Sequence, residues 1–198
     1  ISAKLVANMI EHAGTDRVVT ADLHARQIQG FFDIPVDHLL GVPLLAGWFK
    51  EHLIGDQDTS QFVVVSPDAG GVVRARKLAT LLRAEISIVD KRRRHDMANI
   101  CEVMEIIGTD VADKTCIIID DMISSGESML DTCKELKERK AAKAIVCCTF
   151  GLFTNGLEKF DEYYEKGWLD RVITTNLNYR IPELLTRPYY IEANMSKY

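Results

Sequence analysis

The feature that most constrains the fold is a wholly apolar, β-branched run at residues 117–119, which predicts a strand buried on both faces. Asp120 and Asp121 follow at its carboxyl end. A turn rich in small and hydroxyl residues comes next, and residues 129–136 then have the apolar spacing of a helix. This order favours a phosphate site, because the backbone N–H groups of the turn and the positive end of the helix both attract a dianion.

The turn also carries side chains suited to a sugar phosphate. Ser124, Ser125 and Ser128 supply hydroxyl donors, and the two acids before them accept hydrogen bonds from sugar hydroxyls. The stretch therefore predicts a pocket for a phosphate and a diol together. The alternative that these residues leave open is that the serines only cap the helix.

Apolar runs and helical patterns alternate along the rest of the chain. This alternation predicts an α/β fold with a mostly parallel sheet flanked by helices. We expect a loop between Pro35 and Pro43 and another at residues 91–95. The expected strands are residues 17–20, 61–66, 85–90, 103–107, the central run, 144–149, 171–175 and 189–191.

The composition limits the classes of partner. The chain has 198 residues and a net charge of −5, so it lacks the basic excess of a nucleic-acid binder, and we expect no nucleic-acid partner. No apolar run approaches the ~20 residues of a membrane span, so we expect no membrane partner. None of the five cysteines has the spacing of a zinc or redox motif, which predicts reduced, buried thiols in the cytoplasm.

Two further polar segments follow predicted strands, and parallel sheets bind ligands at the carboxyl ends of their strands. In residues 66–71, Gly70 and Gly71 allow an anion nest, and Asp68 beside them suits Mg²⁺. A plain turn with a capping aspartate is the alternative there. His24 follows Asp22, which is placed to orient its ring, although a lone histidine is more often a structural residue.

Residues 91–95 place Lys91 beside three arginines in an acidic protein. Such a run is by default solvated surface. Because it leaves a strand end of the same sheet, it also predicts a basic flap that closes over a polyphosphate and neutralises developing charge.

The order of strand, acids and hydroxyl-rich turn in residues 117–128 resembles the ribose-phosphate loop of the type I phosphoribosyltransferase fold. Glu127 departs from the usual loop, and we expect its carboxylate to point away from the phosphate. Over nearly its whole length the chain resembles the ribose-phosphate pyrophosphokinases, also called phosphoribosyl pyrophosphate synthetases. The motifs that carry this resemblance are Thr20-Ala21-Asp22-Leu23-His24-Ala25, Gln27-Ile28-Gln29-Gly30-Phe31-Phe32, Ser66-Pro67-Asp68-Ala69-Gly70-Gly71, Lys91-Arg92-Arg93-Arg94 and Ile119-Asp120-Asp121-Met122.

The resemblance implies a reaction and a set of roles. The family transfers the β,γ-pyrophosphoryl group of ATP to the C1 hydroxyl of ribose 5-phosphate, with Mg²⁺ as cofactor, and releases AMP. By motif match, Lys91 and Arg93 are catalytic, with Arg93 also contacting the substrate, while His24 and Asp68 hold the metal. The remaining residues implied are Asp68, Ala69, Gly70 and Gly71 for the pyrophosphate loop, Asp120 and Asp121 for the ribose hydroxyls, and Ser124, Ser125, Gly126, Glu127 and Ser128 for the 5-phosphate.

The resemblance also implies that residues 1–41 are the tail of an amino-terminal phosphoribosyltransferase-like domain and residues 42–198 a carboxyl-terminal one, in a homo-oligomer. We expect the 198-residue piece alone to make little product. One alternative is a phosphoribosyltransferase, against which His24 and the four-cation run argue. Another is a non-catalytic regulatory subunit, against which the intact Lys91, Arg93, His24 and Asp68 argue.

Overall fold

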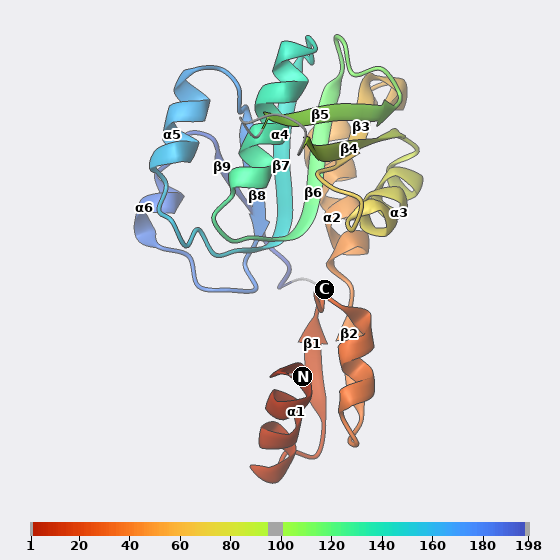
Figure 1. Ribbon diagram of the computed structural model, residues 1–198, viewed down its shortest axis with the longest axis vertical. Coiled ribbons are helices and arrows are strands. Elements are labelled where there is room, and N and C mark those ends of the chain that lie inside the picture. The colour runs from red at the N-terminus through yellow and green to blue at the C-terminus, as the bar shows by residue number, and fades with distance from the viewer. Residues whose placement is uncertain (1, 95–100, 197–198) are drawn as a thin grey trace. The chain divides into compact units, whose positions relative to one another are not determined.

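The computed structural model describes the backbone of residues 2–94 and 101–196, and the side chains of these residues except those of 91–94 and 101–103. The chain forms two compact units, Ile1–Gly41 and Val42–Tyr198 (Figure 1). The assignment of the first unit to the tail of an amino-terminal domain stays a prediction.

The first unit contains a two-stranded parallel sheet in which Val18 stands opposite Val36. The loop expected between Pro35 and Pro43 is therefore wrong at both ends: residues 36–39 form a strand and residues 41–43 begin helix α2 (Gly41–Phe49). A four-residue strand is too short to show a periodic pattern, and its pairing with the other strand of this sheet makes it a strand. The elements of this unit are α1 (Ser2–His12), β1 (Val18–Ala21), the 3₁₀ helix η1 (Arg26–Phe31) and β2 (Val36–Leu39).

The second unit is built on a seven-stranded sheet in the order β5-β4-β3-β6-β7-β8-β9. Neighbouring strands are parallel except β4 and β5, which are antiparallel. The predicted α/β fold with a mostly parallel sheet is thus confirmed. The strands are β3 (Phe62–Ser66), β4 (Glu85–Arg94), β5 (Cys101–Gly108), β6 (Thr115–Ile123), β7 (Lys143–Gly151), β8 (Arg171–Thr175) and β9 (Tyr190–Ala193).

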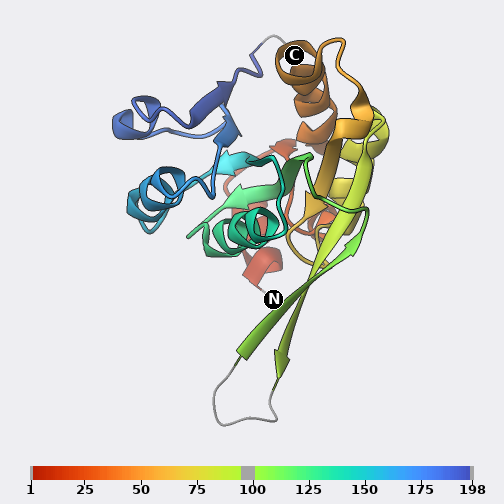
Figure 2. The same cartoon turned by 90° about the horizontal axis from the view of Figure 1, so that it is seen from above.

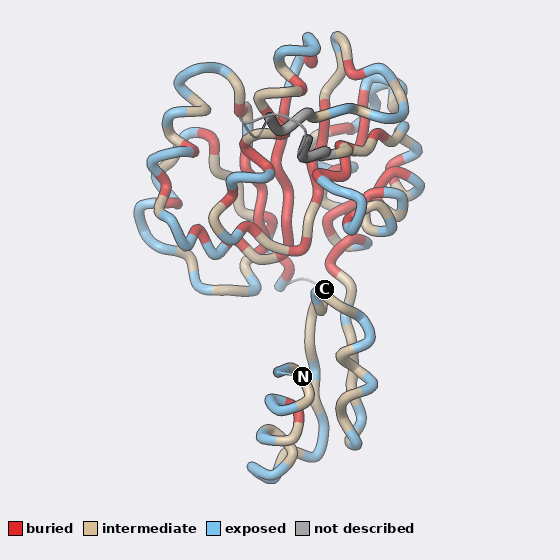
Figure 3. The backbone as a smooth tube through the Cα atoms, viewed as in Figure 1, coloured by how far each residue is buried: buried red, intermediate tan, exposed pale blue. Residues whose placement is uncertain are grey.

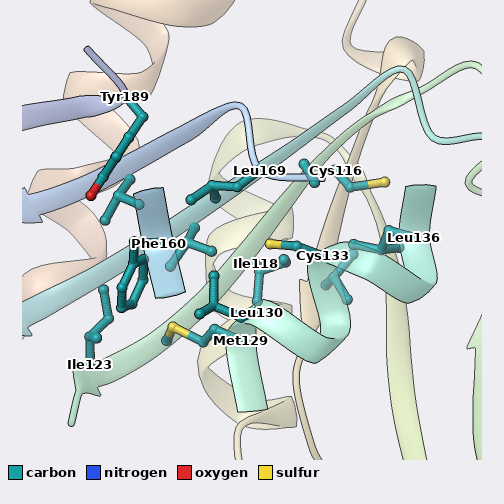
Figure 4. Close-up of a cluster of buried hydrophobic side chains, with 14 of the residues drawn as sticks. Cys116, Ile118, Ile123, Met129, Leu130, Cys133, Leu136, Phe160, Leu169 and Tyr189 are labelled. Atoms are coloured by element: carbon teal, nitrogen blue, oxygen red, sulfur yellow. The ribbon is translucent and has the colours of Figure 1, made fainter. Parts of the chain in front are cut away.

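Helices cover both faces of this sheet, so its central strands are buried along most of their length (Figure 3). Successive side chains of a strand point to opposite faces, and two apolar cores result. Ile118 packs with α4 and α5 in one core (Figure 4), while Ile117 and Ile119 pack with α2 and α3 in the other. The helices are α2 (Gly41–Phe49), continued by the π-helical turn η2 (Lys50–Ile54), the 3₁₀ helix η3 (Thr59–Gln61), α3 (Val72–Leu82), α4 (Glu127–Glu138), α5 (Glu158–Glu165) and α6 (Pro182–Leu185).

The basic run after Asp90 is not a loop where the structure describes it. β4 continues through Arg94 and pairs with β5, with Lys91 opposite Met104 and Arg93 opposite Glu102. The two strands run together beyond the rest of the sheet (Figure 2). The predicted loop is therefore wrong for Lys91 to Arg94, because pairing with β5 satisfies the backbone of a segment that has no apolar spacing; His95 lies outside the described residues.

The cysteines behave as predicted where they are described. Cys116, Cys133, Cys147 and Cys148 are buried free thiols, and burial raises the pKa of each. Among residues 2–94 and 101–196, no helix combines the length and the apolar character needed to cross a bilayer.

Candidate functional site

Three of the segments that the sequence singles out leave the same edge of the seven-stranded sheet. β3 is parallel to β6, with Val65 opposite Ile118, and parallel to β4, with Ser66 opposite Ile88. The carboxyl ends of these strands therefore lie together, as parallel sheets require. The turn after β3, the turn after β6 and the extension of β4 all start from this edge.

A cavity of about 150 Å³ lies between the end of β6 and the start of α4. Gly126, at φ +81°, turns the chain sharply so that α4 begins at Glu127. The side chains of Ser124 and Ser128 are exposed beside this helix start. The residues that line the cavity are Asp120, Met122, Ile123, Ser124, Ser125, Gly126, Glu127, Ser128 and Met129.

The two acids of the motif have different surroundings. Asp120 lines the cavity and its side chain is 27% exposed, whereas that of Asp121 is 2% exposed and does not line the cavity. Successive strand residues point to opposite faces, which explains the difference. Asp120 is therefore the acid placed to meet a ligand in this cavity, and a role for Asp121 at a sugar hydroxyl stays a prediction.

Arg74 contacts both acids and is the site residue that the sequence reasoning missed. One guanidinium nitrogen of Arg74 donates to Oδ1 of Asp120 at 2.6 Å and lies 3.7 Å from Oδ1 of Asp121. In the sequence, Arg74 is only one of several cations on the polar side of its helix. Its position just after a glycine turn at a strand end was the available signal, because a helix start at that edge borders the neighbouring strand's carboxyl end.

The electrostatics of the cavity centre on Asp120. Burial, together with a side-chain hydrogen bond to Asp121, raises the pKa of Asp120 to about 6, and the positive charge of Arg74 opposes that rise. The backbone N–H of Asp121 also donates to Oδ1 of Asp120 at 2.9 Å. Burial therefore favours the neutral form of Asp120, and the described cation Arg74 favours its carboxylate.

Helix α5 packs against the turn between β6 and α4. A Cβ added to Gly126 would lie 2.3 Å from the ring of Phe160, so only glycine fits between that ring and the helix start. Beside it, Nζ of Lys159 donates to the carboxylate of Glu127 at 2.7 Å. The Glu127 side chain therefore reaches toward α5, and the pairing lowers the pKa of Glu127.

The turn after β3 is held by its own side chains. The backbone N–H of Gly71 donates to Oδ1 of Asp68 at 2.8 Å, and the hydroxyl of Ser66 donates to the Asp68 carbonyl oxygen at 2.7 Å. The predicted loop residues Asp68, Ala69 and Gly70 are exposed. Within the described residues, no group of three or more His, Cys, Asp or Glu side chains is placed to hold a metal.

The remaining predicted residues are His24, in the first unit, and Lys91 and Arg93, whose side chains are outside the described part of the chain. His24 is exposed in the first unit, after the buried Asp22, whose φ of +39° is unusual for a residue other than glycine. The neighbouring backbone N–H of Leu23 donates to Nε2 of His38 at 2.9 Å. Lys91 and Arg93 have described backbones in β4, and their side chains lie outside the described part.

Comparison with known proteins shows which family the chain resembles. Residues 38–180 match the family model for the phosphoribosyl transferase domain. The chain is 53% identical over 154 residues to the ribose-phosphate pyrophosphokinase of Clostridium perfringens, covering 78% of this chain and 47% of that protein. It is 55% identical over 150 residues to ribose-phosphate pyrophosphokinase 1 of Streptococcus pneumoniae, covering 75% of this chain and 45% of that protein.

A solved structure agrees with these sequences. The phosphoribosylpyrophosphate synthetase from Mycobacterium smegmatis superposes with a TM-score of 0.83 at 35% identity, covering 98% of this chain and 59% of that one. The chain thus spans about half the length of the curated relatives it matches.

Proposed function

This chain belongs to the phosphoribosyl transferase domain family, and from that premise we propose that the protein containing it is a ribose-phosphate pyrophosphokinase. The C1 hydroxyl of ribose 5-phosphate attacks the β-phosphorus of ATP. The bond from that phosphorus to the oxygen bridging to the α-phosphate breaks, and the hydroxyl loses its proton. The products are phosphoribosyl pyrophosphate and AMP.

The observation that carries the proposal is the cavity at the end of β6 in a chain 53% identical over 154 residues to a ribose-phosphate pyrophosphokinase. One wall of that cavity is the carboxylate of Asp120, and the other is the amino-terminal turn of α4. A carboxylate accepts from a diol and cannot bind phosphate, whereas a helix start attracts a phosphate. The two walls therefore suit opposite ends of one sugar phosphate.

The proposed roles follow from this division. The 5-phosphate is held by the backbone N–H groups at the start of α4 and by the hydroxyls of Ser124, Ser125 and Ser128. Asp120 orients the ribose. The turn Asp68 to Gly71 holds the polyphosphate at the neighbouring strand end. Lys91 and Arg93, on the extension of β4, neutralise the charge that develops on the transferring group. Positioning and charge stabilisation supply most of the rate in phosphoryl transfer, so no side-chain nucleophile is needed.

A magnesium ion fits this site on the chemistry of its donors. Mg²⁺ prefers oxygen ligands and is usually bound through one or two carboxylates, several waters and substrate phosphates. Asp68 offers an exposed carboxylate whose orientation is set by the N–H of Gly71. The metal role that the family resemblance implies for His24, in the first unit, stays a prediction. When bound, the metal supplies positive charge to the polyphosphate. A cytoplasmic location and a homo-oligomeric state complete the proposal, the first supported by the buried free thiols.

The test is to mix the full-length protein with ATP, Mg²⁺ and ribose 5-phosphate. AMP and phosphoribosyl pyrophosphate are expected in equal amounts. A phosphoribosyltransferase, the second candidate, would instead consume phosphoribosyl pyrophosphate when a nucleobase is added, and a regulatory subunit would do neither. Either of those results would reject the synthetase assignment.

Replacing Asp120 with asparagine is expected to separate the two walls of the cavity. The substitution removes the charged acceptor for the ribose hydroxyls, so the dissociation constant for ribose 5-phosphate should rise roughly 10–100-fold, the scale of one or two charged hydrogen bonds. The dissociation constant for inorganic phosphate should change little. Calorimetry with both ligands measures this, and Asp131→Asn, on α4 outside the cavity, is the matched control. Equal losses for both ligands would contradict the division of roles.

Removing Lys159 is expected to weaken phosphate binding. Lys159→Met leaves the Glu127 carboxylate unpaired at the first residue of α4, where it repels an incoming dianion. Because the pair is exposed, the dissociation constant for inorganic phosphate should rise only roughly two- to fivefold. Glu127→Gln in the same background should reverse the loss. Lys166→Met, which breaks a pair with Glu162 on the same helix, is the control and should have no effect; a similar loss there would refute the local explanation.

A further inference from the structure

Arg74 connects the turn after β3 with Asp120, the acid that lines the cavity at the end of β6. Arg74 is the third residue of α3, which starts directly after the Asp68–Gly71 turn. Its side chain crosses to the neighbouring strand, 46 residues away in sequence, and is 19% exposed. The ion pair between Arg74 and Asp120 is therefore more enclosed than the pairs that Lys159 and Lys166 form. Dissolved salt screens its electrostatic attraction less than that of an exposed pair.

The geometry points to Arg74 as the positioning residue for Asp120: it keeps this carboxylate ionised and directed at the ribose hydroxyls, at a set distance from the polyphosphate turn. This inference rests on the proposed function. Arg74 donates to Oδ1 of Asp120 at 2.6 Å, a short charge-assisted hydrogen bond that fixes the carboxylate's orientation. Helix α3 begins at the glycine turn, where the N–H of Ala75 donates to the carbonyl oxygen of Gly71 at 3.0 Å. Arg74 thus joins the turn and the acid through a rigid element.

The neighbours of Asp120 explain why a cation is needed. Among the side chains that the structure describes, those that act on Asp120 are Arg74 from α3, Asp121 beside it on β6 and the buried thiol of Cys148 on β7, while Glu127 at the start of α4 lines the same cavity. Of these described groups, Arg74 alone is positive, so its charge opposes protonation of Asp120, together with the hydrogen bond from the backbone N–H of Asp121. A protonated Asp120 would be a weaker acceptor for sugar hydroxyls, since its charge would be lost.

A double-mutant cycle in the full-length protein tests this inference. Arg74→Gln is expected to raise the dissociation constant for ribose 5-phosphate roughly tenfold or more, the scale of one charged hydrogen bond, with the constant for inorganic phosphate nearly unchanged. If Arg74 acts through Asp120, Arg74→Gln in the Asp120→Asn background should add less than roughly twofold, because the two residues form one unit. Multiplication of the two single losses would overturn the inference, and so would an unchanged affinity in Arg74→Gln.

A pH series provides the readout that a purely structural role would not move. A carboxylate acceptor is fully present above its pKa and is lost as the pH falls through it. Wild-type affinity for ribose 5-phosphate should therefore fall below about pH 6, on the pKa of Asp120, and Arg74→Gln should move this fall to higher pH. The ligand's own phosphate titrates identically in every variant. An unshifted fall would contradict the inference.

Two further variants keep the outcome decisive. Arg74→Lys retains the charge without the planar fork, so its pH profile should stay close to wild type while its affinity is intermediate. It also replaces Arg74→Gln in the cycle if the latter fails to fold. Arg76→Gln, an exposed cation on the same helix, is the matched control and should leave both affinity and pH profile unchanged. If wild type itself makes no phosphoribosyl pyrophosphate, the proposed function has failed; if wild type is active and the cycle is multiplicative, only the role of Arg74 has failed.

Discussion

Replacing Lys91 with alanine is expected to lower the turnover number of the full-length protein roughly 10²–10³-fold, as when one preorganised charge stabiliser is removed. The fold-loss in turnover number should exceed the fold-change in either Michaelis constant, because we propose that Lys91 stabilises charge that develops only in the transition state. Lys91 stands opposite Met104, where β4 has passed beyond its pairing with β3. The basic residues therefore lie on the paired extension of β4 and β5, which leaves the sheet at the same edge as the cavity.

Steady-state kinetics with ATP and ribose 5-phosphate varied separately measure this prediction. Lys77→Ala, which removes a cation from α3, is the control and should keep the wild-type turnover number. Lys91→Arg should restore part of the lost rate because it retains the charge. A Lys91→Ala variant with normal turnover and a raised Michaelis constant would show that the residue acts in ground-state binding instead.

Replacing Gly126 with alanine is expected to lower the free energy of unfolding by about 2–5 kcal/mol. Two costs combine: the left-handed backbone at φ +81° costs an L-residue about 1–2 kcal/mol, and forcing a methyl group against Phe160 costs about 1–3 kcal/mol. Phe160 lies in the buried cluster with Ile123 and Met129, so the ring has little room to move (Figure 4). The strain should also distort the phosphate turn.

Urea denaturation of the full-length protein measures the loss, and a second glycine separates its two causes. Gly167 has a φ of +71° and nothing within 4 Å of an added Cβ, so Gly167→Ala should show the backbone cost alone. In a Phe160→Leu background, Gly126→Ala should cost less than in wild type. Equal losses at the two glycines would show that contact with Phe160 contributes nothing.

The parts of the fold that could be predicted are those with a strong local signal. The β-branched runs of β3 and β6 are buried on both faces by helices, so their residues are apolar at every position and mark central parallel strands. The helix after each run follows from apolar spacing and from the glycine turn that precedes it. Because ligands bind at the carboxyl ends of parallel strands, these local signals also located the cavity residues Asp120 and 122–128.

The strands that the sequence misassigned have no such signal. The basic end of β4 and the short β2 owe their conformation to backbone pairing with β5 and β1. Backbone hydrogen bonds do not depend on the type of side chain. A charged strand or a four-residue strand therefore shows no periodic pattern of apolar residues in the sequence. Only the presence of its partner strand makes it a strand.

The central strands of the sheet, the turns at its edge and the residue types of the cavity could be predicted from the sequence, because burial and turn geometry act on neighbours in the chain. The tertiary structure decided how those residues are used. It placed Arg74 on Asp120 and Lys159 on Glu127, pairs separated by 46 and 32 residues. It also buried Asp121 while leaving Asp120 at the cavity. Contacts between side chains far apart in sequence depend on how the strands and helices pack, and no local pattern records that packing.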